Sequence, residues 1–408
     1  MLLSVTLLLS LALTSCGGAE HLDNLFGTQT DSAAELISVC LPWNQNREIS
    51  RLDSPITVEI YNGVTVDLQY QGWPTITKGK DGTLYAVSSV RTEHIDIFGA
   101  VGFTKSTDNG NTWEPMRLII DTPIDDRDTG IVYLGDDHLM VTWGTNNASA
   151  YREGGIYGAY RDRCTPAQLE AIDARLDSLD DDELRGASWV MHSYDGGLTW
   201  GDKIELPITS PHGASLMQDG KGLICMGRPT GMSGTALNSK SLYSFESYDS
   251  GYTWTQKGEF PLPGFFEGKV YEAYIIQLKD SSFLAAFRSE LEGLATYTMY
   301  SEDGVHWNNY QFVCDGSPPH LLELQNGVIL LTYASRQYPT GARGRLSFDG
   351  GKTWGKEIEI SKASNPNDWD LGYASSIELN NGCIITAYYQ KMKNDTYCSL
   401  LYTKWYLQ

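Results

Sequence analysis

The sequence predicts an all-β protein, a β-propeller of six blades, because two repeats run through the same part of the chain. The first repeat, Ser-x-Asp-x-Gly-x-Thr-Trp, recurs in five complete or nearly complete copies that start at residues 106, 193, 247, 301 and 347. The second is a hairpin pattern, in which a short apolar strand, a polar turn and a longer apolar strand follow one another. It recurs six times, from residues 74, 129, 213, 273, 319 and 374. A repeat of roughly fifty-five residues is what four strands with their loops require in one propeller blade.

Two further segments, one within the repeats and one before them, show patterns of their own. One interval is longer than the others and contains "TPAQLEAIDARLDSLDDDELRG", residues 165–186, whose Leu and Ile recur at helical spacing. It predicts a short helical insertion in a blade loop. The segment "ITVEIYN", residues 56–62, precedes the first hairpin. We expect it to close the ring by pairing with the last blade.

The Ser-x-Asp repeats fall at the turn between the third and fourth strands of a blade. Asp and Ser can satisfy turn backbone N–H groups, Gly supplies a positive φ, and Trp can pack beneath the neighbouring strand. Strand order places these turns on the face away from the mouth of the central channel. The repeats are therefore predicted to be structural rather than ligand-binding.

Composition limits the partners of the chain. It has 408 residues, a formal net charge of −21 and a pI of about 4.6, and its Lys and Arg do not cluster. Nucleic acid and anionic membrane surfaces are therefore excluded as partners. The cysteines form no CxxC pair and the histidines show no metal-ligand spacing, so no disulfide framework, metal or cofactor is predicted, and Cys225 and Cys383 are expected to be buried thiols.

The N-terminus, "MLLSVTLLLSLALTSCGG", is predicted to be a targeting segment. Its apolar run is too short for a stable membrane span and ends in Leu-Thr-Ser-Cys, which resembles the bacterial lipobox, although no Lys or Arg precedes the run. We therefore expect a lipoprotein signal peptide over 1–16 with lipidation at Cys16, a linker over 17–54 and a propeller over 55–408. The alternative is an ordinary secretory signal. The expected location is the bacterial cell envelope, lipid-anchored, or the exterior.

The strand order also brings two groups of polar residues to the mouth. The group just before each hairpin contains Gln71, Trp73, Asp126, Arg127, Asp128, His212, Glu272, His320 and Tyr373. The group just after the second strands contains Arg91, His94, Asp96, Arg228, Arg288, Arg336 and Arg343. Carboxylates, arginines and a tyrosine in one concave site indicate an enzyme that acts on an anionic or polyhydroxylated ligand.

Five such repeats with six hairpins resemble the sialidase superfamily, whose six-bladed propellers carry Asp-box, or BNR, turns. The resemblance extends from about Tyr70 to the C-terminus and implies a fold and a catalytic set. It implies that Tyr373 in "DLGYASSIEL" is the nucleophile and that Glu272 in "EAYIIQLKDSSFLAAFR" is its base. It further implies that Asp96 in "SSVRTEHIDIFG" is the acid/base residue, with His94 and Asp128 as alternatives.

The resemblance also implies a set of substrate-binding residues. These are Arg91, Arg288, Arg343 (with Arg345 in "YPTGARGRLSFDGGKTW" as the alternative), Asp128, Trp73, His94, His212 and His320. Trp73 would stack on a sugar ring or plug the channel. The two histidines that follow Pro, His212 and His320, would contact ligand or serve the core.

The implied chemistry suits a 2-keto sugar acid. Its carboxylate lies on the anomeric carbon and would repel an anionic nucleophile, which a neutral tyrosine avoids. Because an unperturbed tyrosine has a pKa near 10, it needs the neighbouring base Glu272. Asp96 would protonate the leaving oxygen and then activate water, and arginines would bind the substrate carboxylate in bidentate fashion.

One departure from the family leaves the substrate open. The family opens its first blade with Tyr-Arg-Ile-Pro, whose Arg binds the carboxylate, whereas this chain reads "YQGWPTI" from Tyr70 to Ile76. Losing one bidentate contact would cost roughly 2–5 kcal/mol, unless Arg91 or Arg127 substitutes. The expected function is an exo-glycosidase that removes terminal sialic acid or a related acidic sugar from glycans. The alternatives are a glycosidase or lyase for polysaccharides that contain uronic acid or rhamnose, and a non-catalytic glycan-binding lipoprotein.

Overall fold

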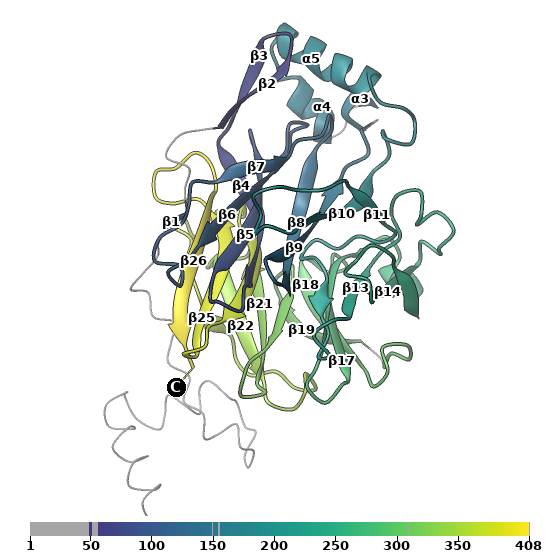
Figure 1. The fold of residues 1–408 in the computed structure, drawn as a ribbon, viewed down its shortest axis with the longest axis vertical. Coiled ribbons are helices and arrows are strands. Elements are labelled where there is room, and N and C mark those ends of the chain that lie inside the picture. The colour runs from purple at the N-terminus through teal and green to yellow at the C-terminus, as the bar shows by residue number, and fades with distance from the viewer. Residues whose placement is uncertain (1–48, 51–55, 149, 154–155, 309, 408) are drawn as a thin grey trace, which may run out of the picture.

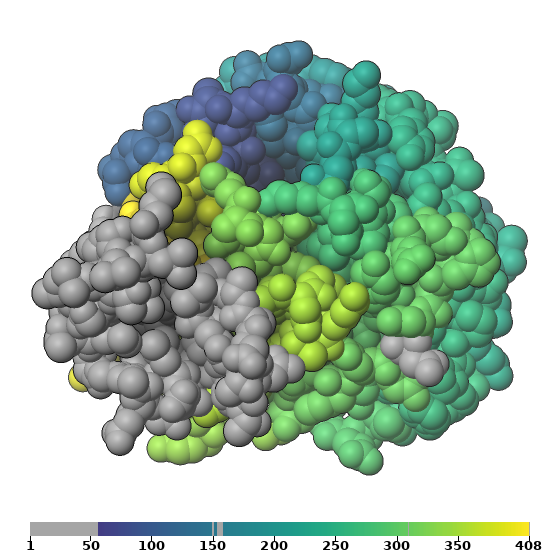
Figure 2. All heavy atoms as spheres, turned by 90° about the horizontal axis from the view of Figure 1, so that it is seen from below, coloured from purple at the N-terminus to yellow at the C-terminus, as the bar shows by residue number. Residues whose placement is uncertain are grey.

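The computed structural model describes residues 49–50, 56–148, 150–153, 156–308 and 310–407. Within these residues the strands form six four-stranded antiparallel sheets and one two-stranded sheet. In each four-stranded sheet consecutive strands are neighbours, except that the last sheet takes its outer strand from the N-terminal part of the chain. The prediction of an all-β propeller of six blades is confirmed. Figure 1 shows the blades in chain order, and in Figure 2, seen from below, the colours pass around the molecule from purple through teal to green.

The first three blades have the following strands. Blade one contains β4 (Tyr70–Lys78), β5 (Leu84–Arg91), β6 (Ala100–Ser106) and β7 (Arg117–Ile120). Blade two contains β8 (Asp126–Gly135), β9 (His138–Thr145), β10 (Ala187–Ser193) and β11 (Ile204–Leu206). Blade three contains β12 (Ser215–Leu216), β13 (Leu223–Gly227), β14 (Ser241–Ser247) and β15 (Thr255–Pro261).

The remaining three blades repeat this order. Blade four contains β16 (Val270–Gln277), β17 (Phe283–Ser289), β18 (Ala295–Ser301) and β19 (Gln311–Asp315), and is preceded by a 3-10 turn, η3 (Gly264–Phe266). Blade five contains β20 (His320–Glu323), β21 (Ile329–Ser335), β22 (Gly341–Ser347) and β23 (Ile358–Glu359). Blade six contains β24 (Gly372–Glu378), β25 (Cys383–Gln390), β26 (Ser399–Tyr406) and β1 (Ile49–Ser50).

The ring closes differently from the sequence-based prediction. The closing strand is β1, which pairs with β26 through Ile49 opposite Leu401 and Ser50 opposite Leu400. The prediction that residues 56–62 close the ring is wrong, because β2 (Ile56–Tyr61) pairs with β3 (Val64–Leu68) as a separate hairpin. Asn62 and Gly63, both at positive φ (44° and 76°), form its turn. Asn-Gly is the preferred sequence for such a two-residue turn, and it gives the strand a local partner.

The helical insertion lies between the second and third strands of blade two. It contains α3 (Ala150–Glu153), α4 (Ile156–Arg161) and α5 (Pro166–Asp177), and α5 confirms the predicted helix. Thr165 caps α5 by accepting from the Gln168 backbone N–H, while the Gln168 side chain accepts from the Thr165 backbone. The helices and the β2–β3 hairpin share one apolar cluster and lie together at the top of Figure 1.

The five Ser-x-Asp repeats form the turns between third and fourth strands, and their hydrogen bonds are internal. In the second copy Ser193 Oγ accepts from Gly197 N (2.8 Å) and donates to Asp195 Oδ1 (2.8 Å). Asp195 in turn accepts from the backbone N–H and the hydroxyl of Thr199. Gly197 lies at φ 86°, where a Cβ atom would clash with the Phe103 ring of the neighbouring blade. These contacts support the structural interpretation of the repeats.

The remaining sequence-based expectations concern thiols and membrane segments. Cys225, Cys314, Cys383 and Cys398 are buried and Cys164 is half-buried, all as free thiols. Among the residues that the structure describes, none belongs to a helix long and apolar enough to cross a membrane. The predicted signal peptide, the lipidation site at Cys16 and the linker lie outside the described residues, apart from the β1 strand at the end of the linker.

Candidate active site

The same β-bulge opens the innermost strand of four blades. In blades one, two, four and six, two residues of the inner strand lie opposite one residue of the second strand, between Gly72 and Thr75 and at the three equivalent positions. The first bulged residue has a left-handed backbone in every case: Trp73 (φ 51°), Asp128 (54°), Glu272 (52°) and Tyr373 (53°). A positive φ is uncommon for residues of this size, and bulges re-aim side chains. The repeated bulge therefore directs four different side chains toward the centre of the ring.

Tyr373, Glu272 and Arg288 form a hydrogen-bonded row at this centre. The Tyr373 hydroxyl donates to Glu272 Oε1 in a very short contact, and Arg288 Nη1 donates to the same oxygen at 2.7 Å. The Tyr373 hydroxyl also lies 3.3 Å from Asp128 Oδ1. Glu272 and Asp128 reach solvent, with 12% and 30% of their side chains exposed. The structure thus brings four residues of the sequence-predicted site into one hydrogen-bonded group: Tyr373, Glu272, Asp128 and Arg288.

Burial and charge set opposite pKa shifts within this row. Burial raises the pKa of the Tyr373 phenol well above its usual value, and the carboxylates of Asp128 and Glu272 raise it further. Burial also opposes ionisation of Glu272, but Arg288 and the hydrogen bonds from Tyr373 and Arg288 outweigh it, so the pKa of Glu272 is lowered. A neutral phenol therefore donates a hydrogen bond to an ionised carboxylate.

Trp73 lies in the stretch that opens the first blade, "YQGWPTI", where the family resemblance implies an arginine and this chain has none. Its indole is buried and two guanidinium groups lie close to it, with Arg91 Cζ 4.7 Å and Arg127 Cζ 4.4 Å from the ring centroid. Its ring also meets Tyr373 edge to face, with centroids 6.2 Å apart. Cation–π contacts of this kind hold two positive groups beside an apolar surface. Trp73 thus lies beside Tyr373 and close to two arginines, Arg91 and Arg127, which share the carboxylate of Asp125.

Arg91 and Asp96 form a closed ion pair. Arg91 Nη2 binds Asp96 Oδ1 and Asp125 Oδ1, each at 2.7 Å, and all three side chains are fully buried. The second oxygen of Asp96 accepts the backbone N–H and the hydroxyl of Thr92, each at 2.6 Å. Both oxygens of Asp96 are therefore occupied, and its acid/base role stays a prediction that would require these bonds to break.

His94, two residues earlier, lies at the surface of the site with 24% of its side chain exposed. Its Nδ1 is 2.8 Å from Asp370 Oδ1 and 2.9 Å from the Tyr70 hydroxyl, which itself donates to Asp370 at 2.7 Å. The ring stands edge-on to Trp73 with centroids 5.2 Å apart. Sequence reasoning missed Asp370 and Tyr70. Asp370 lies three residues before Tyr373 and Tyr70 opens the first blade, so the two are far apart in the sequence and no local motif signals that they meet.

The two arginines of β22, Arg343 and Arg345, both bond within their own blade. Arg343 is buried in β22, where its guanidinium donates to the carbonyls of Ala342, Ser361 and Pro339 and to Glu357. These partners belong to its own blade, so the structure does not bring Arg343 to the central row, and its substrate role stays a prediction. Its alternative Arg345 likewise bonds within blade five, to Gly355 and Tyr333.

Arg336 is the residue that the structure brings to the centre in its place. It follows β21 directly, just as Arg91 ends β5 and Arg288 lies near the end of β17. Its Nε donates to the Leu371 carbonyl at 2.8 Å and its Nη2 to the Tyr389 hydroxyl at 3.3 Å. Burial opposes its charge, yet Tyr389, Glu272 and Tyr373 raise the pKa of Arg336. Its position just after a second strand is what placed Arg336 in the sequence-predicted mouth group, although it was not among the predicted substrate-binding residues.

His212 and His320 lie beneath Tyr373 rather than at the surface. The His212 ring is 5.4 Å from the rings of both Tyr373 and His320, and His320 stacks on Tyr274 at 4.7 Å. Burial lowers the pKa of His212 to about 4 and that of His320 well below its usual value. Both are therefore neutral core residues at pH 7. Within the described part of the chain, no cluster of three His, Cys, Asp or Glu side chains has the geometry of a metal site.

Comparisons with known proteins bear on the fold that carries this site. No family model matches the sequence. The chain is 24% identical over 277 residues to a sialidase from Paraclostridium sordellii, a match that covers 62% of this chain and 61% of the relative. The chain thus spans about three fifths of the length of that curated relative.

Solved structures resemble the fold as a whole. A protein of unknown function from Dyadobacter fermentans superposes with a TM-score of 0.65 at 18% identity, over 88% of this chain and 99% of that one. A Hadza microbial sialidase gives a TM-score of 0.58 at 16% identity, over 83% of this chain and 66% of that one. A Trypanosoma rangeli sialidase, solved in complex with sialic acid, gives 0.58 at 15% identity, over 89% and 59%. The chain therefore has the six-bladed propeller fold of the sialidase superfamily.

Proposed function

We propose that the protein is an exo-glycosidase that hydrolyses a terminal sialic acid or a related acidic sugar from glycans. The observation that carries the proposal is the row Arg288–Glu272–Tyr373, in which a buried phenol donates to an ionised carboxylate. The curated relative named a sialidase and the sialidase folds above support the same reaction class. A phenol without a neighbouring base would be too weak a nucleophile at neutral pH.

In the proposed reaction Tyr373 Oη attacks the anomeric carbon while its proton passes to Glu272 Oε1. The glycosidic C–O bond breaks and the leaving oxygen takes a proton from an acid on the other side of the sugar. The deprotonated acid then takes a proton from water, whose oxygen attacks the anomeric carbon; the tyrosine–sugar bond breaks, and Glu272 returns its proton to Tyr373. Arg288 holds Glu272 in its ionised form before the first step, when it must accept the tyrosine proton.

We assign the acid/base role to His94. It is partly exposed and oriented by Asp370 and Tyr70, whereas both oxygens of Asp96 are already bonded. Asp128 lies 3.3 Å from the Tyr373 hydroxyl, which is too close for a group that must act on the opposite side of the anomeric carbon. Burial lowers the pKa of His94 despite the opposing effect of Asp370, and the charge of a bound acidic sugar would raise it again.

His94→Gln tests this assignment through the leaving group. If His94 is the acid, kcat falls by about 10²–10⁴-fold on a sugar leaving group, which needs protonation. It falls much less on a methylumbelliferyl leaving group, which is acidic enough to depart unprotonated. Asp370→Asn should show a weaker form of the same split. An equal loss on both substrates would contradict the assignment and return Asp96 to consideration.

The proposed substrate is an acidic sugar because cationic groups surround the row. Arg288 and Arg336 both act to lower the pKa of Glu272, and Arg288 acts in the same direction on Tyr373. The guanidinium of Arg127 lies over the ring of Trp73. Since the stretch that opens the first blade lacks the arginine that the family resemblance implies, the carboxylate of the sugar would be bound by these arginines in a different arrangement. This favours a keto-deoxy sugar acid or a uronic acid alongside sialic acid.

Release of reducing sugar from a glycan panel tests the function. The panel contains sialosides, keto-deoxy sugar acids, uronides and rhamnosides, and the matched variant is Tyr373→Phe. Release of an acidic sugar by the protein, and its loss in Tyr373→Phe, is expected. A product that absorbs near 235 nm would instead reveal a lyase, which forms an unsaturated uronate. No release from any glycan would contradict the proposal and favour glycan binding without turnover.

We also propose that the protein is held in the bacterial cell envelope by a lipid on Cys16. The support is the sequence around Cys16, which resembles a lipobox. Cys16→Ser should move the protein from the membrane fraction to the soluble fraction of lysed cells. Unchanged fractionation would count against the lipid anchor.

A further inference from the structure

A polar groove of about 520 Å³ lies outside the Tyr373–Glu272 row. Its lining residues are Thr65, Val66, Asp67, Gln69, Thr92, Glu93, Tyr160, Arg163, Cys164, Gln168 and Tyr397. They come from the β2–β3 hairpin and the segment after it, from the loop that follows β5, from the helical insertion and from the loop before β26. The hairpin and the insertion are additions to the six four-stranded blades, so the groove is a product of these additions.

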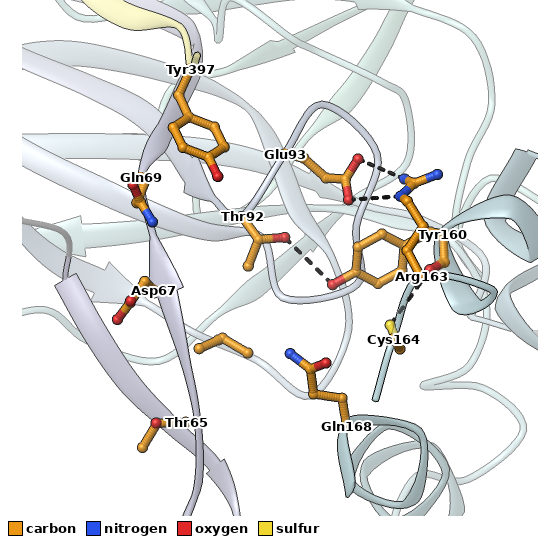
Figure 3. A pocket seen from close by; sticks show the side chains of 11 residues that line it. Thr65, Asp67, Gln69, Thr92, Glu93, Tyr160, Arg163, Cys164, Gln168 and Tyr397 are labelled. Atoms are coloured by element: carbon orange, nitrogen blue, oxygen red, sulfur yellow. Dashed lines mark hydrogen bonds and ion pairs between the residues drawn. The ribbon is translucent and has the colours of Figure 1, made fainter. Parts of the chain in front are cut away.

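The inner surface of the groove presents hydrogen-bonding groups in neutral form. Figure 3 shows the Tyr397 hydroxyl and the amides of Gln69 and Gln168 directed toward the same space. Gln168 Oε1 is engaged in the cap of α5, so its N–H₂ group is the part that faces the groove. Amides and hydroxyls that both donate and accept match the hydroxyls of a sugar.

The charges of the groove disfavour an anionic ligand. Arg163 binds both oxygens of Glu93, at 2.6 and 3.3 Å, and lies over the Tyr160 ring at 5.8 Å. This ion pair leaves Asp67 as the uncompensated charge of the lining, within a chain of net charge −21. A carboxylate or phosphate would be repelled, whereas a neutral polyhydroxylated ligand would not.

Tyr397 connects the groove to the central site. It lines the groove and also packs against the aromatic cluster that contains Trp73 and Tyr373. The next residue is fixed to the first blade, because the Cys398 carbonyl accepts from Gln71 N at 3.0 Å. On the other side Thr92 lines the groove and hydrogen-bonds Asp96, in the same loop as His94. Tyr397 therefore contacts both the groove and the aromatic cluster of the central site, and the loop that carries His94 borders the groove through Thr92.

We propose that this groove binds the neutral sugar residues that precede the terminal acidic sugar in the same glycan. The inference rests on the proposed function and adds a site to it: the central row cleaves the acidic sugar, and the groove retains the neutral chain on the leaving side. The added hairpin and helical insertion then confer preference for longer glycans. The chemical class of the ligand is a neutral oligosaccharide.

Gln69→Ala and Tyr397→Phe test the groove without touching the row of Tyr373, Glu272 and Arg288. Each variant removes one hydrogen-bonding group, and Tyr397→Phe keeps the ring that packs against the aromatic cluster. Matched controls are Gln256→Ala and Tyr248→Phe, two exposed residues of blade three. The two assayed substrates carry the same terminal acidic sugar, once on a neutral disaccharide and once on methylumbelliferone.

We expect each groove variant to lower kcat/KM on the disaccharide-linked substrate by about 3- to 10-fold, the effect of one lost hydrogen bond. On the methylumbelliferyl substrate the same variants should stay within about twofold of the unaltered protein, within the scatter that surface substitutions produce. Equal losses on both substrates, or no loss on either, would overturn the groove proposal while leaving the glycosidase intact.

A binding measurement separates the groove from the reaction. Saturation-transfer NMR with the Tyr373→Phe protein reports contact with neutral di- and trisaccharides of galactose, glucose, N-acetylhexosamine and rhamnose. Contact that disappears in the Gln69→Ala/Tyr397→Phe combination, but not in the controls, supports the groove even if no glycan is hydrolysed. Absence of contact with every sugar overturns it even if hydrolysis occurs.

Discussion

The two ends of the blades repeat in different ways. At the turns between third and fourth strands, the same residues recur: a Ser, an Asp and a Gly make the same internal hydrogen bonds in copy after copy. At the start of the inner strands, the same backbone bulge recurs in four blades, yet it carries a Trp, an Asp, a Glu and a Tyr. Identical side chains in every copy indicate a structural role. One backbone geometry that carries different side chains indicates a site for binding or reaction.

The largest effect should come from the bulge end of blade four. Glu272→Gln removes the proposed base of Tyr373 and one of the two carboxylates that pair with Arg288, so kcat should fall by about 10²–10⁴-fold. Steady-state kinetics on the best substrate of the panel measures the change. The control is Glu246→Gln, which breaks an ion pair with Lys257 on the third strand of blade three and should leave kcat unchanged. Similar losses in both variants would erase the distinction between the two ends.

Acid separates two residues of these regions, His212 and Asp195, by the pH at which each loses its contribution to stability. His212, beneath Tyr373, has a folded-state pKa of about 4 against about 6.5 when unfolded, so the unfolded chain binds more protons between these values. Stability therefore falls as the pH drops from about 6.5 to 4, by up to roughly 3 kcal/mol. Asp195, whose pKa is about 2 because of its bonds to Thr199, loses its contribution only below about pH 4.

Urea unfolding at pH 7, 5 and 4 measures these windows. His212→Gln should flatten the loss between pH 7 and 4 relative to the unaltered protein. Asp195→Asn should leave that window unchanged and alter only the slope below about pH 4. If His212→Gln has the same pH dependence as the unaltered protein, the histidine is not the group that titrates.

A smaller effect is expected at the turn end. Ser247 is buried, accepts from Gly251 N at 2.8 Å and donates to Asp249 Oδ1 at 2.8 Å. Ser247→Ala leaves these partners unsatisfied and should lower the free energy of unfolding by about 1–3 kcal/mol with kcat unchanged. Ser364→Ala, at an exposed position, is the control. A loss of activity without a loss of stability would contradict the structural interpretation of the repeats.

The smallest effect isolates the bulge itself. Asp128→Gly and Asp128→Ala both delete the carboxylate, but only Ala must adopt the left-handed backbone at a cost. The Gly variant should be the more stable by about 1 kcal/mol in urea unfolding. At Glu323, in the inner strand of blade five, the same pair should rank in the opposite order, because Gly weakens a regular strand. The same ranking at both positions would show that the bulge stores no backbone strain.

Sequence patterns predicted the parts of the molecule that local chemistry determines. Six hairpins and five turns follow from alternation and turn residues, and the position at the start of an inner strand identified Tyr373 and Glu272 together. Ring closure was mispredicted because the Asn62–Gly63 turn gives β2 a neighbour in sequence, while β1 has no pattern in its two residues. Local propensity cannot show which of two strands pairs with a segment at the far end of the chain.

The arginines show where side-chain direction, rather than strand position, decides. Arg343 precedes its repeat as the resemblance implies, but its third strand turns it toward the carbonyls of blade five. Asp96 has the spacing from Arg91 that the resemblance implies for the acid, yet both of its carboxylate oxygens accept hydrogen bonds, one from Arg91 and one from Thr92. Such competition among buried polar groups depends on three-dimensional packing that spacing does not encode.

The ring of blades is completed by two residues from near the beginning of the chain and one strand from its end. Without β26, β1 has no partner, and the sixth blade lacks its two outer strands. The pairing of Ile49 with Leu401 joins residues about 350 positions apart, and contacts of such separation form slowly because the entropy of closing the loop is lost before they stabilise the chain. Closure of the ring is therefore expected to be a late event in folding, after the local hairpins of the blades.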